Sequence, residues 1–543
     1  MTETNVTTAA AAPIRGSGAA GAGGFYTRKA TGLVRGISVR DSFIMNVAFI
    51  NIALGALAFT LAPYAFPGAS LGLTVLFTTL LTVFPTVMYA MLAGSMPRSG
   101  GDYVFVSRIL HPGLGFAANF NITVWITFFT GILASWVAGF AGSSAALTLG
   151  TVLHSDTLIH WSERLATKGW QFGVGLATIA LFTVLVAMGT RITFRVLGVI
   201  FAAMIVCQLV AVVIMLVHSG ADFQAAFAKY ANYDQVIADA RAGGFHGGGF
   251  DLGNTLAAMP LVFSSLGYGV VSAYCAGEVK SASRSSMVSM VGALLFGGLF
   301  IGVLGVLASH VFGSEFLGSL TFLSYGDNYP LSSPPFFYLF VSMLTGSPVL
   351  LAIVAIGFVL AIVANIPPAF LLATRNILAW SFDRTVPTRL AEVNPRFASP
   401  VNATVAVGVF MALCLAYFVY VPAKWTTFVY TAGIGALLTF FVVAICGIVF
   451  PWRRPDIYEG SPYRMSVLGI PVITVVSVVA AAFDVVLIVF LLTNDALGAN
   501  STQGIVALPI VFGAGLLIYG VASVVNRRRG IDIAAAQQEL PPE

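Results

Sequence analysis

Residues 46–63 read NVAFINIALGALAFTLAP, an apolar stretch with two asparagines and a glycine near its centre. Apolar stretches of about 20 residues cross a lipid bilayer as helices. A membrane-spanning helix loses backbone hydrogen bonds only where the freed groups are buried in protein or line a cavity. The stretch therefore predicts a broken transmembrane helix that forms part of a binding site, with Asn51 and Gly55 at its centre.

The stretch from 259 to 274, MPLVFSSLGYGVVSAY, repeats this pattern in the sixth predicted transmembrane helix. Interrupted helices at corresponding positions of two halves are typical of inverted-repeat transporters. Such breaks present amide groups to a carboxylate and carbonyl groups to an ammonium group, so a zwitterion is the natural solute. The alternative is that these glycines only let helices pack closely. In the eighth predicted helix, Asn365, Pro367 and Pro368 either shape a pathway or simply bend the helix.

The composition of the 543 residues fits a protein embedded in lipid, because 58% are apolar and 9% are charged, whereas soluble domains carry roughly 25% charged residues. We predict an all-α integral membrane protein with about 12 transmembrane helices. The predicted helices cover residues 42–65, 71–95, 114–147, 170–189, 193–218, 254–276, 286–311, 347–379, 402–421, 427–450, 467–493 and 504–526. They form a transporter domain, 41–526, between a disordered basic N-terminal tail, 1–40, and a C-terminal tail, 527–543.

Basic residues are distributed unevenly between the segments that connect these helices. If the N-terminus is cytoplasmic, 21 of the 26 Lys and Arg residues fall on the cytoplasmic side and 5 on the other side. This asymmetry follows the positive-inside rule and predicts that both termini are cytoplasmic. The net charge of +5 then reflects topology, so we expect no nucleic-acid partner. The long outer segments, 219–253 and 312–346, are predicted to be loops, the first with a helical patch at 223–240.

Four further stretches carry a resemblance to a known family. They are MPRSGGDYVFVSRILHPGLGF at 96–116, YCAGEVKSASR at 274–284, ATRNILAWSFDRTVPTRLAEVNPRFASPVNA at 373–403 and PWRRPDIYEGSPYR at 451–464. In this order they resemble segments of the amino acid, polyamine and organocation permeases. The resemblance implies a LeuT-type fold, with a 5+5 inverted repeat at 42–218 and 254–450 and two extra helices within 467–526. It also implies alternating access around a central site.

Substrate-binding candidates combine the two broken helices with this resemblance. By position, the first-helix glycine motif of the family falls on residues 53–57 and its unwound sixth-helix segment on 264–270. The chain departs from many relatives at Leu57, where they have a second glycine, and from some at Val270, where they have an acid. The predicted substrate site comprises Asn51, Ala53, Gly55, Ala56, Leu57, Ser264, Ser265, Gly267, Tyr268, Gly269 and Asn365.

The coupling ion is less constrained by the sequence. Related sodium-coupled transporters use hydroxyl side chains on the eighth helix, yet residues 348–373 contain no Ser or Thr. Some proton-coupled relatives place a lysine in the fifth helix, and residues 196–217 contain none. Asp484, which lies deep in the eleventh predicted helix, is either a proton relay or a hydrogen-bonded packing residue. His310 could titrate near neutral pH or lie at the membrane interface.

Two acidic residues near the inner mouths are candidates for gating. We expect Glu278 to pair with Lys280 and Arg284, and Asp102 to pair with Arg98 and Arg108. The alternative is that these charges simply face water.

These features predict a secondary active transporter that moves amino acids, most simply neutral ones, across the plasma membrane and is coupled to protons or to exchange. The alternatives are a polyamine or organic amine permease, and an amino acid sensor that binds without translocating. We expect no enzymatic activity, because the predicted helices contain no HExxH motif, no paired carboxylates and no Ser-His pairing. The expected partners are a small-molecule substrate and the lipid bilayer, with no metal or cofactor.

Overall fold

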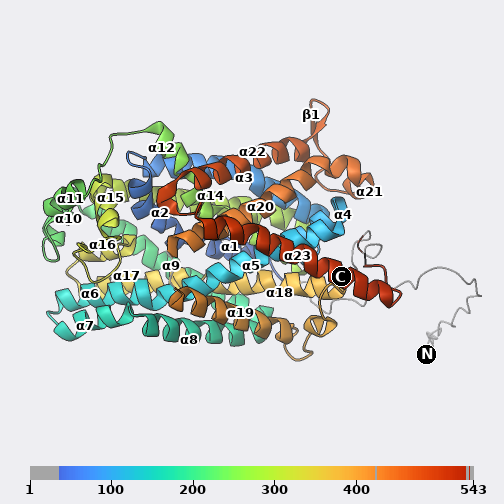
Figure 1. The fold of residues 1–543 in the computed structure, drawn as a ribbon, viewed down its shortest axis with the longest axis horizontal. Helices are drawn as coiled ribbons and strands as arrows, with labels where there is room; N and C mark the ends of the chain where they lie inside the picture. Colours follow the sequence, from blue (N-terminus) through green and yellow to red (C-terminus); the bar gives the residue numbers. More distant parts are fainter. Residues whose placement is uncertain (1–35, 422–424, 534–536, 538–543) are drawn as a thin grey trace, which may run out of the picture.

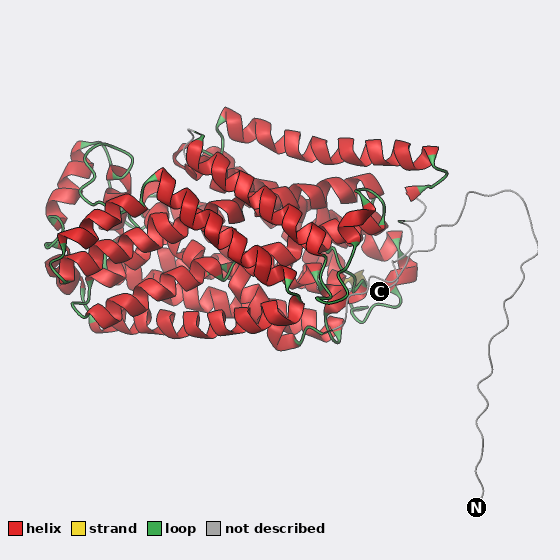
Figure 2. Cartoon of the chain, turned by 90° about the horizontal axis from the view of Figure 1, so that it is seen from below, coloured by secondary structure: helices red, strands yellow, loops and turns green. Residues whose placement is uncertain are grey.

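The computed structural model describes residues 36–421, 425–533 and 537. Its long helices run side by side along one axis and form a single bundle (Figure 1). Figure 2, seen along a perpendicular direction, shows the same bundle built almost entirely of helices joined by short loops. Strands β1 (Ser466–Val467) and β2 (Ile470–Pro471) form a small hairpin between two of the helices.

Most of the predicted transmembrane helices are present as long helices. The first half of the bundle contains α1 (Val39–Ile50), α2 (Ile52–Ala65), α3 (Leu71–Ser95), α5 (Pro112–Trp136), the π-helix η1 (Val137–Gly142), α6 (Ser143–Val152), α8 (Lys168–Ala187) and α9 (Thr190–Val217). The second half and the end of the chain contain α12 (Leu252–Ala257), α13 (Met259–Leu266), α14 (Ala282–Val311), α17 (Pro348–Val363), α18 (Ile366–Phe382), α19 (Val401–Tyr420), α20 (Trp425–Arg453), α22 (Val472–Thr493) and α23 (Thr502–Arg528).

Short helices connect these long ones. They are α4 (Asp102–Ile109), α7 (Asp156–Leu165), α10 (Gly220–Phe227), α11 (Tyr233–Ala242), α15 (Ser314–Leu323), α16 (Phe337–Met343) and α21 (Pro455–Tyr458), with 3-10 turns η2 (Val271–Tyr274), η3 (Ala276–Glu278), η4 (Thr388–Ala391) and η5 (Asp495–Leu497).

The count of spans agrees with the expectation of about twelve. Within the described residues, eleven helical segments are long and apolar enough to cross a membrane. The remaining predicted span, the sixth at 254–276, corresponds to Leu252–Leu266, which is shorter because the chain leaves the helix at Gly267. The all-α membrane architecture predicted from the sequence is therefore confirmed.

Three spans are broken, and their breaks contact one another. Asn51 separates α1 from α2 with a left-handed backbone (φ 57°), a conformation that asparagine tolerates better than most residues. The carbonyls left free at the end of α1 accept hydrogen bonds from other broken spans: Ile50 O from Ser265 Oγ at 2.5 Å, and Phe49 O from Asn365 Nδ2 at 3.1 Å. These side chains hold the three breaks together.

The third break lies between α17 and α18, where the two helices leave Ala364 and Asn365 outside both. Pro367 and Pro368 follow directly, and neither has an N–H group to donate to the preceding turn. The proline pair therefore interrupts the backbone hydrogen bonds of this span. At the break, the side chain of Asn365 donates to Phe49 O at the end of α1.

The contacts between helices follow the symmetry expected of two equivalent halves. Helix α3 packs against α14, and α8 packs against α19. The contact of α5 with α20 has a counterpart in the contact of α17 with α9. If α3 corresponds to α14, α5 to α17, α8 to α19 and α9 to α20, exchanging the two halves converts these contacts into one another, as an inverted repeat requires. The repeat boundaries themselves stay a prediction.

Several boundaries differ from expectation. Helix α1 begins at Val39, inside the predicted tail 1–40, because Ser38 and Asp41 form a capping box; residues 1–35 lie outside the described part. Helix α23 extends to Arg528, into the predicted C-terminal tail, of which 534–536 and 538–543 are also outside it.

The outer segments contain more helix than predicted. The predicted loop 312–346 contains α15 and α16, and α15 packs against α2 and α11. The helical patch predicted at 223–240 is two helices, α10 and α11, since Asn232 caps the start of the second. The loop prediction for 312–346 was therefore wrong, because its apolar residues bury themselves against α2.

Candidate functional site

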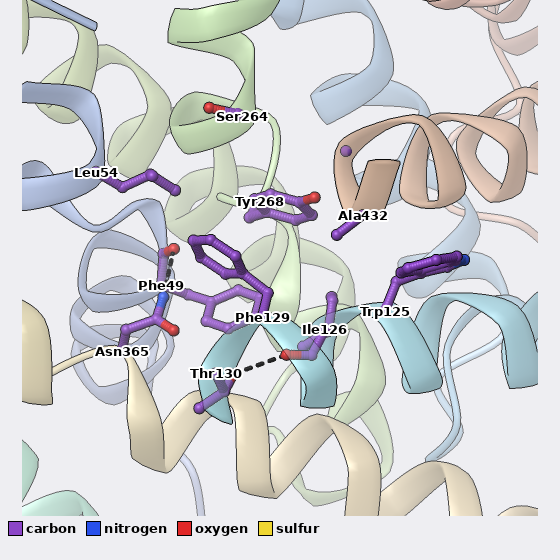
Figure 3. A pocket seen from close by; sticks show the side chains of 11 residues that line it. Phe49, Leu54, Trp125, Ile126, Phe129, Thr130, Ser264, Tyr268, Asn365 and Ala432 are labelled. Carbon is purple, nitrogen blue, oxygen red and sulfur yellow. Dashed lines mark hydrogen bonds between the residues drawn. The ribbon is translucent and has the colours of Figure 1, made fainter. Parts of the chain in front are cut away.

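The three helix breaks surround one pocket in the middle of the bundle (Figure 3). The open cavity has a volume of only about 20 Å³. A solute of amino-acid size therefore enters only after side chains move. The pocket is lined by Phe49, Leu54, Trp125, Ile126, Phe129, Thr130, Ser264, Tyr268, Asn365, Ala432 and Gly433.

Aromatic rings and uncharged polar groups make up most of this lining. The rings of Phe49 and Tyr268 meet edge to face at 5.8 Å between centroids, and Phe129 projects from α5 beside Phe49, while Trp125 lies farther along α5 (Figure 3). None of the lining residues carries a charge at neutral pH. The pocket therefore suits a solute with an apolar part and a polar part whose charges cancel.

Most polar side chains of the lining already donate to the protein. Thr130 Oγ1 donates to Ile126 O at 2.8 Å, and Ser264 Oγ donates to Leu261 O at 2.6 Å. Asn365 differs, because its amide nitrogen binds Phe49 O while its Oδ1 is buried and has no hydrogen-bond partner among the described residues. Buried acceptors of this kind need a partner, so Oδ1 is available to an ammonium group.

The start of α2 offers the complementary donors. The first N–H groups of a helix have no acceptor within the helix, and those of Ile52 and Ala53 lie next to the left-handed Asn51. The side chain of Asn51 caps Leu54 N at 3.2 Å, while its Nδ2 is buried without a hydrogen-bond partner in the described structure. Together with the helix dipole, these donors make the start of α2, beside the pocket, electrostatically suited to an anionic group such as a carboxylate.

The predicted substrate residues fall into two groups. Ser264, Tyr268 and Asn365 line the pocket, and Asn51 forms the break beside it. The others pack into the surrounding helices. A Cβ at Gly55 would lie 2.6 Å from Ile301 Cδ1 of α14, so this glycine faces a helix contact.

The remaining predicted residues lie outside the pocket lining and pack around the helix breaks. Ser265 binds Ile50 O, Gly267 lies against the ring of Phe263, and Gly269 lies against Ile50. Ala53, Ala56 and Leu57 are buried in α2 and are not part of the lining.

Sequence reasoning missed the wall that α5 and α20 contribute. Trp125, Ile126, Phe129 and Thr130 come from α5, and Ala432 and Gly433 come from α20. A stripe of threonines at 123, 127 and 130 follows helical spacing along α5 and is buried. In a membrane helix such a polar stripe indicates a face turned toward protein, so it was an available signal.

Buried ion pairs close the end of the bundle at which α1 begins and α23 ends, which we call the basic end. Glu278 forms a two-point ion pair with Arg375 of α18, at 2.7 and 3.0 Å, and both side chains are buried. Arg375 also donates to Thr190 Oγ1 at 3.0 Å. The main-chain oxygen of Glu278 accepts from the N–H groups of Gly36 and Ile37, so this contact also holds the start of α1.

A second buried pair at this end joins Arg108 to Asp383 at 3.0 Å. Tyr103 Oη donates to the same carboxylate at 2.8 Å. The expected pairing of Arg108 with Asp102 was therefore wrong, as was that of Glu278 with Lys280 and Arg284, both of which are exposed. The alternative that these acids face water is also wrong, because the fold supplies partners from distant segments.

Asp102 lies between α3 and α5, at the start of α4, and is completely buried. The hydroxyl of Tyr274 donates to its Oδ2. Burial raises the pKa of the Asp102 carboxyl to about 7, and the Tyr274 hydrogen bond lowers it only in part. This carboxyl therefore titrates near neutral pH.

The two other coupling candidates lie apart from the pocket. Asp484 is fully buried in α22, and neither of its carboxyl oxygens has a hydrogen-bond partner among the described residues. The hydrogen-bonded packing role considered for it is therefore not observed. His310 is exposed in the last turn of α14.

Comparisons with known proteins agree with this geometry. The model of the amino acid permease family matches residues 38–517. A curated protein of Arabidopsis thaliana, "Cationic amino acid transporter 4, vacuolar", is 29% identical over 208 residues, which are 38% of this chain and 31% of the relative. The matched part thus spans about a third of the length of that relative.

Proposed function

Since the chain belongs to the amino acid permease family, we propose that its central pocket binds neutral amino acids and carries them across the membrane by alternating access. Family membership makes the protein a multi-pass membrane transporter with a small-molecule substrate rather than an enzyme. The proposal adds the kind of amino acid and the mechanism.

The uncharged pocket at the meeting point of three helix breaks carries the proposal. The start of α2 would hold the substrate carboxylate, and Asn365 Oδ1 would accept from the ammonium group. The side chain of the substrate would then lie against Phe49, Trp125 and Phe129. A charged substrate side chain would find no counter-ion among the lining residues, and burying such a charge without a partner is costly.

The closed state of both the pocket and the basic end supports the proposal of alternating access. The pocket has too little open space for a solute, and the Glu278–Arg375 and Arg108–Asp383 pairs hold the basic end shut. Opening toward this end would separate α18 and the start of α1 from the segment that carries Glu278. We further propose that the basic end faces the cytoplasm of a plasma-membrane protein that is driven by protons or by exchange.

One observation favours a second substrate class. Four aromatic residues line the pocket, and aromatic rings attract cations through their faces. An organic amine or polyamine is therefore the alternative substrate. The printed name of the relative, a cationic amino acid transporter, is compatible with that alternative.

Counterflow in proteoliposomes separates these functions. Vesicles loaded with unlabelled leucine should accumulate external labelled leucine, while vesicles loaded with arginine or putrescine should not. Replacing Asn365 by alanine should reduce leucine counterflow at least ten-fold, on the order of 1–3 kcal/mol of binding. Replacing Leu299, an exposed residue of α14, by alanine is the control.

The other outcomes discriminate the alternatives. Counterflow of putrescine or arginine without that of leucine would favour the amine permease. Leucine-induced thermal stabilisation without counterflow would favour a sensor, since a ligand stabilises a protein that it binds whether or not it is moved.

A further inference from the structure

Two helices that pack against each other carry four buried polar groups that have atoms without a hydrogen-bond partner among the described residues. On α22 these are the carboxyl of Asp484 and the hydroxyl of Ser477, and on α3 they are the hydroxyls of Thr86 and Tyr89. Helix α22 packs along both α3 and α20 (Figure 1). Buried polar atoms are almost always satisfied by protein or by water, so these two helices carry groups that can bind water molecules or protons.

Asp484 is the only acid on α22, and the described side chains supply no cation to balance it. On the helices packed against α22, the titratable residues are Tyr89 on α3 and Tyr430, Cys446 and Arg453 on α20, of which the side chain of Tyr430 lies outside the described part, while α13 carries none. Arg453 is exposed in the last turn of α20. An ionised carboxylate in the middle of a membrane helix is costly without a partner, so the resting carboxyl of Asp484 holds a proton.

Tyr89 connects this carboxyl to the basic end. Its helix α3 packs against α22, which carries Asp484, and its ring packs at 6.4 Å against Phe105, one turn after Asp102 on α4. Asp102 in turn accepts from the Tyr274 hydroxyl through one oxygen, and its other oxygen is buried without a hydrogen-bond partner in the described residues. Because burial raises the pKa of Asp102 to about 7, this group can take up and release protons at physiological pH.

Aromatic neighbours of Tyr89 and Asp484 contact the broken sixth span. The ring of Tyr89 packs against Phe440 at 5.3 Å, and Phe440 packs against the pocket residue Tyr268 at 6.1 Å. Phe483, next to Asp484, packs against Phe263 of α13 at 5.6 Å. A change in the charge or hydration of Asp484 would therefore act on the half-helix that forms one wall of the substrate pocket.

We propose that Asp484 is the proton-binding site of the transporter, that it exchanges its proton with the basic end through Tyr89 and Asp102, and that its proton occupancy controls movement of α13. The proposal rests on the transport function proposed above but concerns what drives it. The transferred proton enters and leaves as a proton, with water as the carrier between the three side chains.

The first test does not depend on the substrate. Infrared difference spectra of the purified protein during a pH step should contain a protonated-carboxyl band that is missing in Asp484→Asn and present in Asp234→Asn, an exposed acid on α11. Tyr89→Phe should keep the band but slow its response at least about ten-fold. The proposal would be overturned if Asp484→Asn kept every protonated-carboxyl band of the wild type.

The second test separates coupling from transport. In proteoliposomes with an alkaline interior, the ratio of gradient-driven leucine accumulation to leucine counterflow should fall at least about ten-fold in Asp484→Asn and stay unchanged in Asp234→Asn. An unchanged ratio in Asp484→Asn would overturn the inference and leave the proposed function intact. The inference would also be overturned if the wild type showed leucine counterflow but no leucine accumulation driven by the pH gradient.

Absence of leucine counterflow in the wild type would instead contradict the proposed function. The infrared measurement then still decides whether Asp484 holds the proton. Equal thermal stability and monodisperse elution of Asp484→Asn and wild type exclude misfolding as the cause of a lost band.

Discussion

Single residues at the basic end show how strongly burial changes the chemistry of a side chain. Asp102 lies in a stretch that contains Arg98 and Arg108, yet its observed partner is the Tyr274 hydroxyl, while Arg108 pairs with Asp383. Burial raises the pKa of this carboxyl from 3.8 to about 7. The folded protein therefore binds a proton here that the unfolded chain releases at lower pH.

This pKa predicts a pH dependence of stability. Because the folded-state pKa is the higher one, the contribution of Asp102 is fully present below about pH 4 and is lost as the pH rises to about 7. The loss is on the order of 4 kcal/mol at most. Melting temperatures measured from pH 4 to pH 8 should fall less steeply for Asp102→Asn than for wild type. Parallel curves would contradict the assignment, and Asp234→Asn serves as the control.

Arg375 illustrates the opposite case, a buried charge that has its partner. Replacing Arg375 by methionine leaves Glu278 buried and unpaired, so unfolding should become easier by about 3–5 kcal/mol. The double variant Arg375→Met, Glu278→Leu removes both charges and should recover much of this loss. Thermal unfolding in detergent measures both effects. A double variant that is less stable than the single one would show that the pair contributes more than mutual neutralisation.

At the scale of elements, glycines near the pocket serve either helix packing or the pocket itself. Gly55 on α2 is pressed against Ile301, whereas a Cβ at Gly433 on α20 would meet no atom within 4 Å. Gly433 also lines the pocket. The space beside Gly433 is therefore open to a bound solute.

Filling this space should affect binding without affecting the fold. Gly433→Val should lower leucine affinity at least ten-fold, about 1.4 kcal/mol or more, while the melting temperature stays close to that of the control Gly513→Val. A Cβ at Gly513, on α23, would likewise meet no atom within 4 Å, and this glycine lies outside the pocket. Ligand-induced thermal shifts measure the affinity, and equal affinities in the two variants would place the solute elsewhere.

At the scale of the whole molecule, the bundle has two distinct ends. The hairpin β1–β2 and the end of α23 lie toward one end in Figure 1, and α10, α11 and α15 lie at the other. Most basic residues belong to the connections at the first end, in agreement with the positive-inside rule. The fold thus presents a charge asymmetry that can be tested directly.

Labelling of introduced cysteines should reveal the orientation. Leu468→Cys, at a position that is 98% exposed in the hairpin, should react with a membrane-impermeant maleimide only in permeabilised cells. Asp327→Cys, in the exposed turn after α15, should react in intact cells. The parent protein, with Cys207, Cys275, Cys414 and Cys446, gives the background. The reverse pattern would invert the proposed topology.

The sequence by itself determined the properties that reside in continuous stretches. Hydropathy defined the spans, and local chemistry placed breaks near Asn51, Gly267 and Asn365, because a chain that lacks helix-forming residues or donors interrupts its own helix. These breaks in turn located three of the residues that line the pocket. The short helices of 312–346 escaped prediction, since their stability comes from packing against α2 rather than from a strong local pattern.

Only the tertiary structure decided which faces and which charges meet. Lipid is as apolar as the protein interior, so a membrane helix carries little sequence signal for its rotation, and Trp125 and Phe129 could not be assigned to the pocket. Glu278 and Arg375 are separated by 97 positions, and Arg108 and Asp383 by 275. Pairing over such distances is set by how the helices pack, and the same packing places α22, which carries Asp484, against α3, which carries Tyr89.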